Sequence, residues 1–188
     1  MSKVNDILNT AERLFDQQGF HSTGIDQIVK EAGVTPRTLY RHFTSKEQLI
    51  LNVLEQREIR FLKQLEKKLN EHEINAPSWL IIISELEEWF VQESSKGCLF
   101  LRALAEYGHK DIEIRQRISD HKQRTFEFLK DQLQREFPNQ LNEKVESLLL
   151  IIEGATALAP IIGGKAAAHR ARLLANNIFI YSTYPLPH

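Results

Sequence analysis

The sequence predicts an all-α protein of about nine helices. Apolar residues recur at steps of three and four along most of the 188 residues, which is the spacing of one helix face. Eight Gly and six Pro, with few long β-branched runs, also favour helices. With 42% hydrophobic and 26% charged residues, the composition is that of an ordinary globular protein, so extended disorder is not expected.

The N-terminal segment predicts two helices separated by a glycine. The apolar face of the first is made by Ile7, Leu8, Ala11, Leu14 and Phe15. Gly19 is expected to end this helix. Thr23 is expected to open the second as its N-cap, with Asp26 as the acid of a capping box. Gly33 is expected to end that helix, because glycine accepts the left-handed conformation of a tight turn.

A third short helix is predicted immediately after this turn. Thr35 is a favourable N-cap, and Pro36 stands at the first helical position, where a missing N–H costs nothing. Leu39 and Phe43, four residues apart, are expected to point inward. Another face carries hydrogen-bonding groups from Arg37, Thr38, Tyr40 and Arg41. Two short helices around a glycine-containing turn predict a helix-turn-helix.

Positive charge is small and local in this chain. The net charge is −1, yet residues 35–46 hold three Lys or Arg and no acid. This distribution suits a module that contacts a few phosphates of a nucleic acid, not one that coats a long backbone.

These motifs, in this order and spacing, resemble the TetR family of bacterial transcriptional regulators. The segments that carry the resemblance are the helix opened by Thr23, then AGV, TPRTLY and HFTSKEQL. The match covers about the first 50 residues and extends beyond them only as a helical plan. It implies a helix-turn-helix DNA-binding domain over residues 1–47 and an effector-binding and dimerisation domain over residues 48–188. A long helix capped by Ser45 with Gln48, or by Thr44 with Glu47, would connect the two.

The resemblance implies a set of DNA contacts at and around the third helix. The set is Thr23, Thr35, Pro36, Arg37, Thr38, Tyr40, Arg41, His42 and Lys46. Arg37 is expected to contact a guanine edge, and Tyr40 and Lys46 are expected to contact phosphates. The alternatives are a solvated Arg37, a Thr35 that only caps its helix, and an inward-facing core tyrosine at position 40.

Six further helices are predicted after residue 45. Their approximate ranges are 46–70, 77–95, 98–108, 111–137, 145–162 and 165–180. Residues 145–162 are apolar nearly all round, so this helix should be buried on all sides, with Pro160 kinking it or ending its regular part. A second copy of the chain is the expected cover, through a four-helix dimer interface made by the last two helices, over about 145–180.

An effector cavity is implied in the helical body. Its candidate lining is Trp79, Trp89, Phe90, Cys98, Phe100, Arg102, Tyr107 and Phe126. An ordinary aromatic core is the alternative. Cys98 is either a redox sensor or an inert buried thiol, and Arg102, Glu106 and His109 either orient a ligand or form a surface strip.

No cofactor, metal site or catalytic constellation is expected. The seven histidines show no paired-ligand spacing, and neither a phosphate-binding glycine loop nor a nucleophile motif is found. A single cysteine, no signal peptide and no apolar run approaching about 18 residues favour a cytoplasmic protein without a membrane span.

The expected function is therefore that of a homodimeric regulator. It would bind a pseudo-palindromic operator in double-stranded DNA and, as a repressor, be released from it by a small-molecule effector. The alternative is a small helical enzyme or ligand carrier whose N-terminal part is only structural. The sequence indicates neither the effector nor the operator, and it does not distinguish repression from activation.

Overall fold

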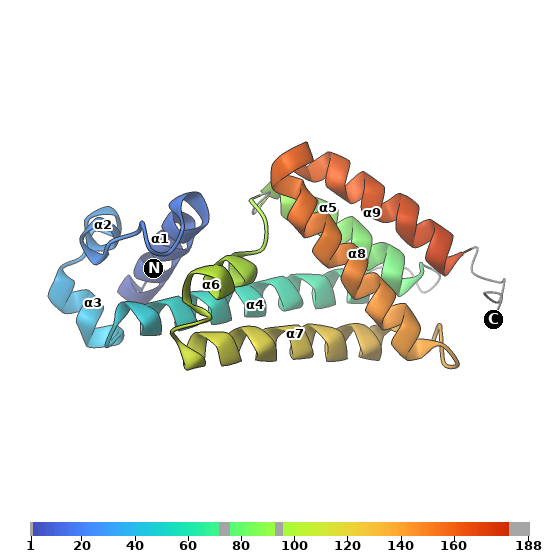
Figure 1. Cartoon of the computed structure of the whole chain (residues 1–188), viewed down its shortest axis with the longest axis horizontal. Helices are drawn as coiled ribbons and strands as arrows, with labels where there is room; N and C mark the ends of the chain where they lie inside the picture. The colour runs from blue at the N-terminus through green and yellow to red at the C-terminus, as the bar shows by residue number, and fades with distance from the viewer. Residues whose placement is uncertain (1, 72–75, 93–95, 181–188) are drawn as a thin grey trace. The chain divides into compact units, whose positions relative to one another are not determined.

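The computed structural model describes residues 2–71, 76–92 and 96–180. Throughout these residues the regular structure is α-helical, as predicted, and nine helices follow one another without a strand (Figure 1). The chain packs as two compact units. The first comprises Met1–Phe61 and Leu99–His121, and the second comprises Leu62–Cys98 and Lys122–His188. The predicted domain boundary at residue 47 stays a prediction.

The first unit is built on three short N-terminal helices. They are α1 (Lys3–Gln18), α2 (Ile25–Glu31) and α3 (Pro36–His42), and the unit also holds the first part of α4 (Lys46–Glu71), α6 (Leu99–Tyr107) and the first part of α7 (Ile112–Leu133). Its core is formed by fully buried side chains such as Ile7, Phe15, Phe20, Ile28 and Leu39. The predicted apolar face of α1 is confirmed, because Ile7, Leu8, Ala11, Leu14 and Phe15 are all buried.

The second unit is dominated by three helices that pack together. These are α5 (Ser78–Gln92), α8 (Leu141–Ile162) and α9 (Gly164–Phe179), which lie side by side in Figure 1. Trp79 of α5 stacks on Phe179 at the end of α9, with ring centroids 5.2 Å apart. The buried ammonium group of Lys144 donates a 2.9 Å hydrogen bond to the carbonyl of Ile178.

Most helix bounds agree with the sequence prediction. α7 ends at Leu133, four residues before the predicted end at residue 137, and α8 departs by the same number of residues. It begins at Leu141, four residues before the predicted start, because a polar first turn precedes the apolar stretch. Pro160 lies inside α8, which ends two residues later at Ile162. The fifth predicted helix extended to residue 95, and residues 93–95 lie outside the described part of the chain.

The expectation that no helix matches a membrane span is wrong for α8. Among the described residues, α8 alone is long and apolar enough to cross a membrane by length and composition, with a mean hydropathy of 1.8. A search for an uninterrupted apolar run does not find this helix, because Glu146 and Glu153 interrupt its apolar sequence. Core helices of soluble proteins meet the same criterion, and α8 packs against α9 and α5.

The prediction that a second copy completes the burial of α8 stays a prediction, because within one chain α8 is only partly buried. Its exposed apolar residues are Leu150, Leu158 and Ile161, at 72%, 38% and 77% exposure. With Gly154 and Ala157 they follow a helical spacing of three and four residues, so they form one uncovered stripe along α8.

Candidate nucleic-acid interface

α2 and α3 form the predicted helix-turn-helix. Four residues separate Glu31 from Pro36, and among them Gly33 adopts a φ of +66°, the left-handed conformation expected of the turn. Ile28, Val29 and Leu39 bury the inner faces of the two helices. This packing leaves the opposite side of α3 facing outward.

The start of α3 is fixed by local hydrogen bonds, as predicted. The Thr35 side chain accepts a 3.2 Å hydrogen bond from the N–H of Thr38, and Pro36 occupies the first turn. The hydroxyls of Thr35 and Thr38 are also 3.0 Å apart. Thr35 is therefore an N-cap whose side chain is still exposed.

The outward side of α3 presents hydrogen-bond donors and an aromatic ring. Arg37, Tyr40, Arg41 and His42 are exposed, whereas Leu39 and Phe43 are buried. Tyr40 is 51% exposed, so the alternative of an inward-facing core tyrosine is wrong. Among the described residues Arg37 forms no hydrogen bond or ion pair, while Arg41 donates to His42 Nε2 at 3.3 Å. The guanidinium of Arg37 is thus available to an external acceptor.

Lys46 lies at the first position of α4. Ser45 caps this helix by accepting a 3.1 Å hydrogen bond from the N–H of Gln48, so the first of the two predicted capping frames is confirmed. Partial burial lowers the pKa of Lys46, and the nearby carboxylates of Glu47 and Glu106 act in the opposite direction. Lys46 thus belongs to the first turn of a helix, and helix N-termini favour bound anions.

Thr23 does not have the position that the sequence predicted. α2 begins at Ile25 with Gly24 as its N-cap and without a side-chain cap, so the predicted capping role of Thr23 is wrong. The fully buried Thr23 hydroxyl instead donates a 2.7 Å hydrogen bond to the carbonyl of Gly19 and accepts one from Gln18. A buried hydroxyl cannot reach DNA, and we leave Thr23 out of the proposed contacts.

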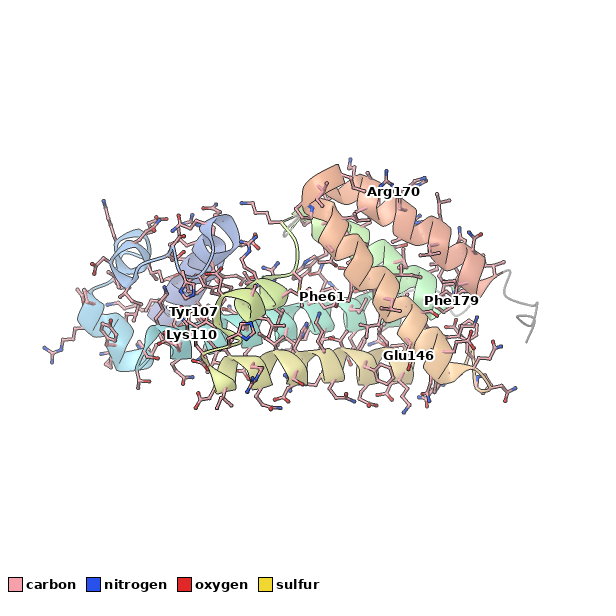
Figure 2. All side chains as sticks on the ribbon, viewed as in Figure 1. Phe61, Tyr107, Lys110, Glu146, Arg170 and Phe179 are labelled. Atoms are coloured by element: carbon pink, nitrogen blue, oxygen red, sulfur yellow. The ribbon has the colours of Figure 1, made fainter. Side chains whose placement is uncertain are left out.

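The eight candidate pocket residues are divided between the two units. In the first unit, Phe100 stacks on His121 with ring centroids 3.6 Å apart. Arg102 donates hydrogen bonds to two backbone carbonyls of α1. Tyr107, at the end of α6 in Figure 2, stacks on His21 at 4.6 Å. These contacts give the three side chains defined surroundings in the first unit. Their predicted role in a ligand pocket stays a prediction.

In the second unit, three of the candidates lie on α5 and are buried, namely Trp79, Trp89 and Phe90. Phe126 is half-buried on α7. Cys98 is also half-buried, and the Lys122 ammonium group lies 4.0 Å from its sulfur while donating to Glu153. Cys98 is therefore not fully buried, and that part of the inert-thiol alternative is wrong.

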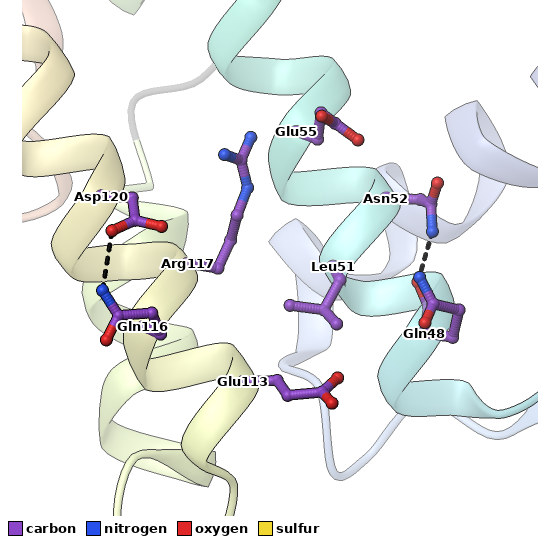
Figure 3. A pocket seen from close by; sticks show the side chains of 8 residues that line it. All are labelled: Gln48, Leu51, Asn52, Glu55, Glu113, Gln116, Arg117 and Asp120. Carbon is purple, nitrogen blue, oxygen red and sulfur yellow. Dashed lines mark hydrogen bonds between the residues drawn. The ribbon is translucent and has the colours of Figure 1, made fainter.

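One hollow in the first unit is lined by polar residues of α4 and α7 (Figure 3). It measures about 350 Å³ and is lined by Gln48, Leu51, Asn52, Glu55, Glu113, Gln116, Arg117 and Asp120. None of the predicted pocket residues lines this hollow. In the described part of the chain, no three His, Cys, Asp or Glu side chains are grouped so as to hold a metal ion.

Comparison with known proteins agrees with this geometry. Residues 7–53 match the model of bacterial regulatory proteins of the tetR family. Residues 7–53 are thus a TetR-family segment. The domain that matches holds α2, the turn, α3 and the first turns of α4, which are the elements described above.

Two proteins outline how far the likeness extends. The chain is 40% identical over 63 residues to the HTH-type transcriptional regulator UidR of Escherichia coli (strain K12), covering 34% of this chain and 32% of UidR. It thus spans about a third of the length of the curated relatives it matches first. Over the whole chain, the fold is that of SCO4454, a TetR-family transcriptional regulator from Streptomyces coelicolor, at a TM-score of 0.87 and 24% identity, covering 98% of each chain.

A second solved structure has the same fold with a ligand bound. It is the transcriptional regulator FadR from Bacillus subtilis in complex with stearoyl-CoA, at a TM-score of 0.76 and 16% identity, covering 94% of this chain and 97% of that one.

Proposed function

We propose that this protein is a homodimeric transcriptional regulator that acts as a repressor by binding a pseudo-palindromic operator. The observation that carries the proposal is the outward face of α3. On that face a free guanidinium, an exposed phenol and a second arginine stand on a capped helix of a TetR-family domain. We propose that each α3 enters one major groove, in the cytoplasm where the target DNA lies.

The proposed contacts divide by chemistry. Arg37 reads a guanine through its O6 and N7 acceptors, because a guanidinium fork matches that pair of atoms. Tyr40 and Lys46 bind phosphates, which position the helix without reading sequence. The remaining proposed contacts are Thr35, Pro36, Thr38, Arg41 and His42.

A single copy presents few positive charges, so we propose that two copies bind together. The exposed stripe of Leu150, Leu158 and Ile161 on α8 would pair with a partner, together with Leu173 and Leu174 of α9, which are 52% and 50% exposed. Joining two such faces would remove apolar surface from water at about 25 cal/mol per Å². A twofold dimer places two α3 helices on half-sites about one DNA turn, or a multiple of it, apart.

We propose that a small organic effector releases the operator. FadR, a protein of the same fold, is solved with stearoyl-CoA, which makes long-chain acyl-CoA esters the first class to test. The predicted lining residues of both units remain our candidates. A coupling of about 1–3 kcal/mol between effector and DNA would change operator affinity by about 5- to 150-fold.

The test compares operator binding of the wild type, Arg37→Ala and Lys46→Ala at several salt concentrations. Arg37→Ala is expected to cost about 1–3 kcal/mol and to relax preference at one base pair. Lys46→Ala is expected to weaken binding to all sequences and to reduce the salt slope by about one unit. Lys110→Ala, an exposed lysine of the same unit, is the matched control. Unchanged binding in both test variants contradicts the proposed site.

A further inference from the structure

The end of α6 holds the turn between α1 and α2 through backbone atoms. The N–H of Phe20 donates to Oε1 of Glu106 at 3.0 Å, and the N–H of His21 donates to Oε2 at 2.6 Å. Nε2 of His21 also donates to the backbone carbonyl of Glu106 at 2.9 Å. Both carboxylate oxygens are therefore engaged by consecutive amides of one turn, and charge-assisted bonds of this kind are about twice as strong as neutral ones.

Gly19 permits this approach. Its φ of +89° is a conformation that side chains rarely adopt, and a Cβ there would lie 3.0 Å from Oε1 of Glu106. The backbone leaves α1 at this glycine and presents the next two amides to the carboxylate. No side chain of the N-terminal helices is needed for the contact.

Arg102, one helical turn before Glu106 on the same face of α6, binds the preceding part of α1. Its Nη1 donates to the carbonyl oxygens of Phe15 at 3.1 Å and Asp16 at 2.9 Å. These carbonyls lie in the last turn of α1, where a cation is favoured by the helix dipole. α6 thus places a positive group on the end of one helix and a negative group on the turn that follows.

A second attachment holds α1 to α4. Glu12 of α1 accepts hydrogen bonds from Arg57 at 2.8 Å and from Arg60 at 2.7 Å. The apolar core of the unit packs α1–α3, and polar attachments to two different helices add to that packing in fixing their orientation. The Glu106 and Arg102 bonds supply the second fixed point.

We propose that Glu106 and Arg102 are positioning residues that set the orientation of α1–α3, and thereby the half-site spacing that a dimer accepts. This proposal rests on the proposed function, because spacing has meaning only for a dimer on a two-part operator. Neither residue touches DNA in this account. They act through the backbone at the end of α1.

The test is a spacing profile. The affinities of wild type, Glu106→Gln and Arg102→Met are measured on operators whose half-sites, selected from random DNA, are separated by spacers changed one base pair at a time. The wild type is expected to prefer one spacing. Each variant is expected to flatten that preference by about tenfold, which corresponds to about 1.4 kcal/mol.

Two controls separate positioning from charge. The Glu106 carboxylate also acts on Lys46, so its removal alters the field at a proposed phosphate contact. Glu47→Gln removes the other carboxylate near Lys46 without removing a bond to Phe20 or His21, and it should shift affinity for all spacings alike. Arg115→Met, at an exposed position of α7, is the control for Arg102→Met.

The outcomes are distinct. All proteins are assayed at a temperature where circular dichroism shows them folded. An unchanged profile in both variants overturns the proposal, and so does a uniform loss of affinity at every spacing, which is the effect of a merely structural role. A wild type that binds no operator specifically contradicts the proposed function instead.

Discussion

The guanidinium group of Arg57 lies 2.8 Å from the carboxylate of Glu12, and only 8% and 9% of these two side chains are exposed. The pair joins α1 to α4 inside the first unit. Breaking a buried pair typically costs about 3–5 kcal/mol. Here Arg60 also binds Glu12 at 2.7 Å and Asp16 lies 3.9 Å from Arg57, so neither charge of the pair loses every partner when the other is removed.

We expect Glu12→Leu to lower the free energy of unfolding by about 3 kcal/mol or more, because two arginines lose this carboxylate, and Arg57→Met to lower it by less, because Arg60 still binds Glu12. The double variant should lose less than the sum of the two single variants, because the Arg57–Glu12 interaction is lost only once. Urea denaturation measures all three. The control is the exposed pair Arg13 and Glu31, where Arg13→Met should cost no more than about 1 kcal/mol. Additive losses in the double variant would contradict a coupled pair.

Gly19→Ala should destabilise the protein more than Gly33→Ala does. Both glycines have a positive φ, but a Cβ at Gly19 would also meet Glu106 at 3.0 Å, while nothing lies within 4 Å of one at Gly33. We expect about 1 kcal/mol for Gly33→Ala from backbone strain alone, and about 2–3 kcal/mol for Gly19→Ala. Thermal unfolding distinguishes the two, and equal losses would mean that Glu106 moves away freely.

Leu150→Glu and Ile161→Glu on α8 should convert the dimer to a monomer. Each places a charge on the stripe that we propose to be covered by the second copy, where an unpaired charge is strongly disfavoured. Sedimentation velocity reports the mass, and operator affinity should fall with it. Ile112→Glu on α7, at a site that is 73% exposed, should leave the mass unchanged. A variant on α8 that sediments like the wild type would remove this interface from the account.

Glu85→Gln should raise stability at neutral pH but not at acid pH. Burial of Glu85 raises the pKa of its carboxyl, and Glu88 adds to this, whereas Lys68, 3.8 Å away, and Gln64 oppose it. A pKa raised above the unfolded value of about 4.5 means that folding favours the protonated form. Wild-type stability is therefore lost as pH rises through the raised pKa.

The gain from Glu85→Gln should then grow between about pH 5 and pH 8, reaching about 1 kcal/mol, the scale of one poorly satisfied buried polar group. Melting temperatures across this range measure it. Glu66→Gln, at an exposed position of α4, is the control and should show no trend. A constant difference between wild type and Glu85→Gln would contradict the pH argument.

The features that the sequence predicted well are those fixed by near neighbours. Thr35 caps α3, Pro36 follows it, and Ser45 caps α4, and each needs only residues within one turn. The outward face of α3 follows from the same helical period, once Leu39 is placed inside.

The predictions that failed concern residues whose contacts are made with partners that lie elsewhere in the chain. Thr23 is a favourable N-cap residue by type, yet its hydroxyl donates a hydrogen bond back to the carbonyl of Gly19, and the N-cap of α2 is Gly24, one residue later than predicted. Glu106 was expected only to orient a ligand or lie on the surface, because the turn that it binds is 85 residues away. Lys144 lies in a polar first turn, so the sequence did not predict its burial. The structure buries its side chain, and the ammonium group donates a hydrogen bond to the carbonyl of Ile178.

Selection of bound sequences from random double-stranded DNA shows whether this protein is a dimer that reads DNA with α3. We expect enrichment of a twofold-symmetric sequence, with half-site centres about 10 base pairs or a multiple of that apart. We also expect Arg37→Ala to relax one position in each half-site. An enriched sequence without symmetry, or no enrichment at any salt concentration, would contradict a dimer that reads DNA with α3.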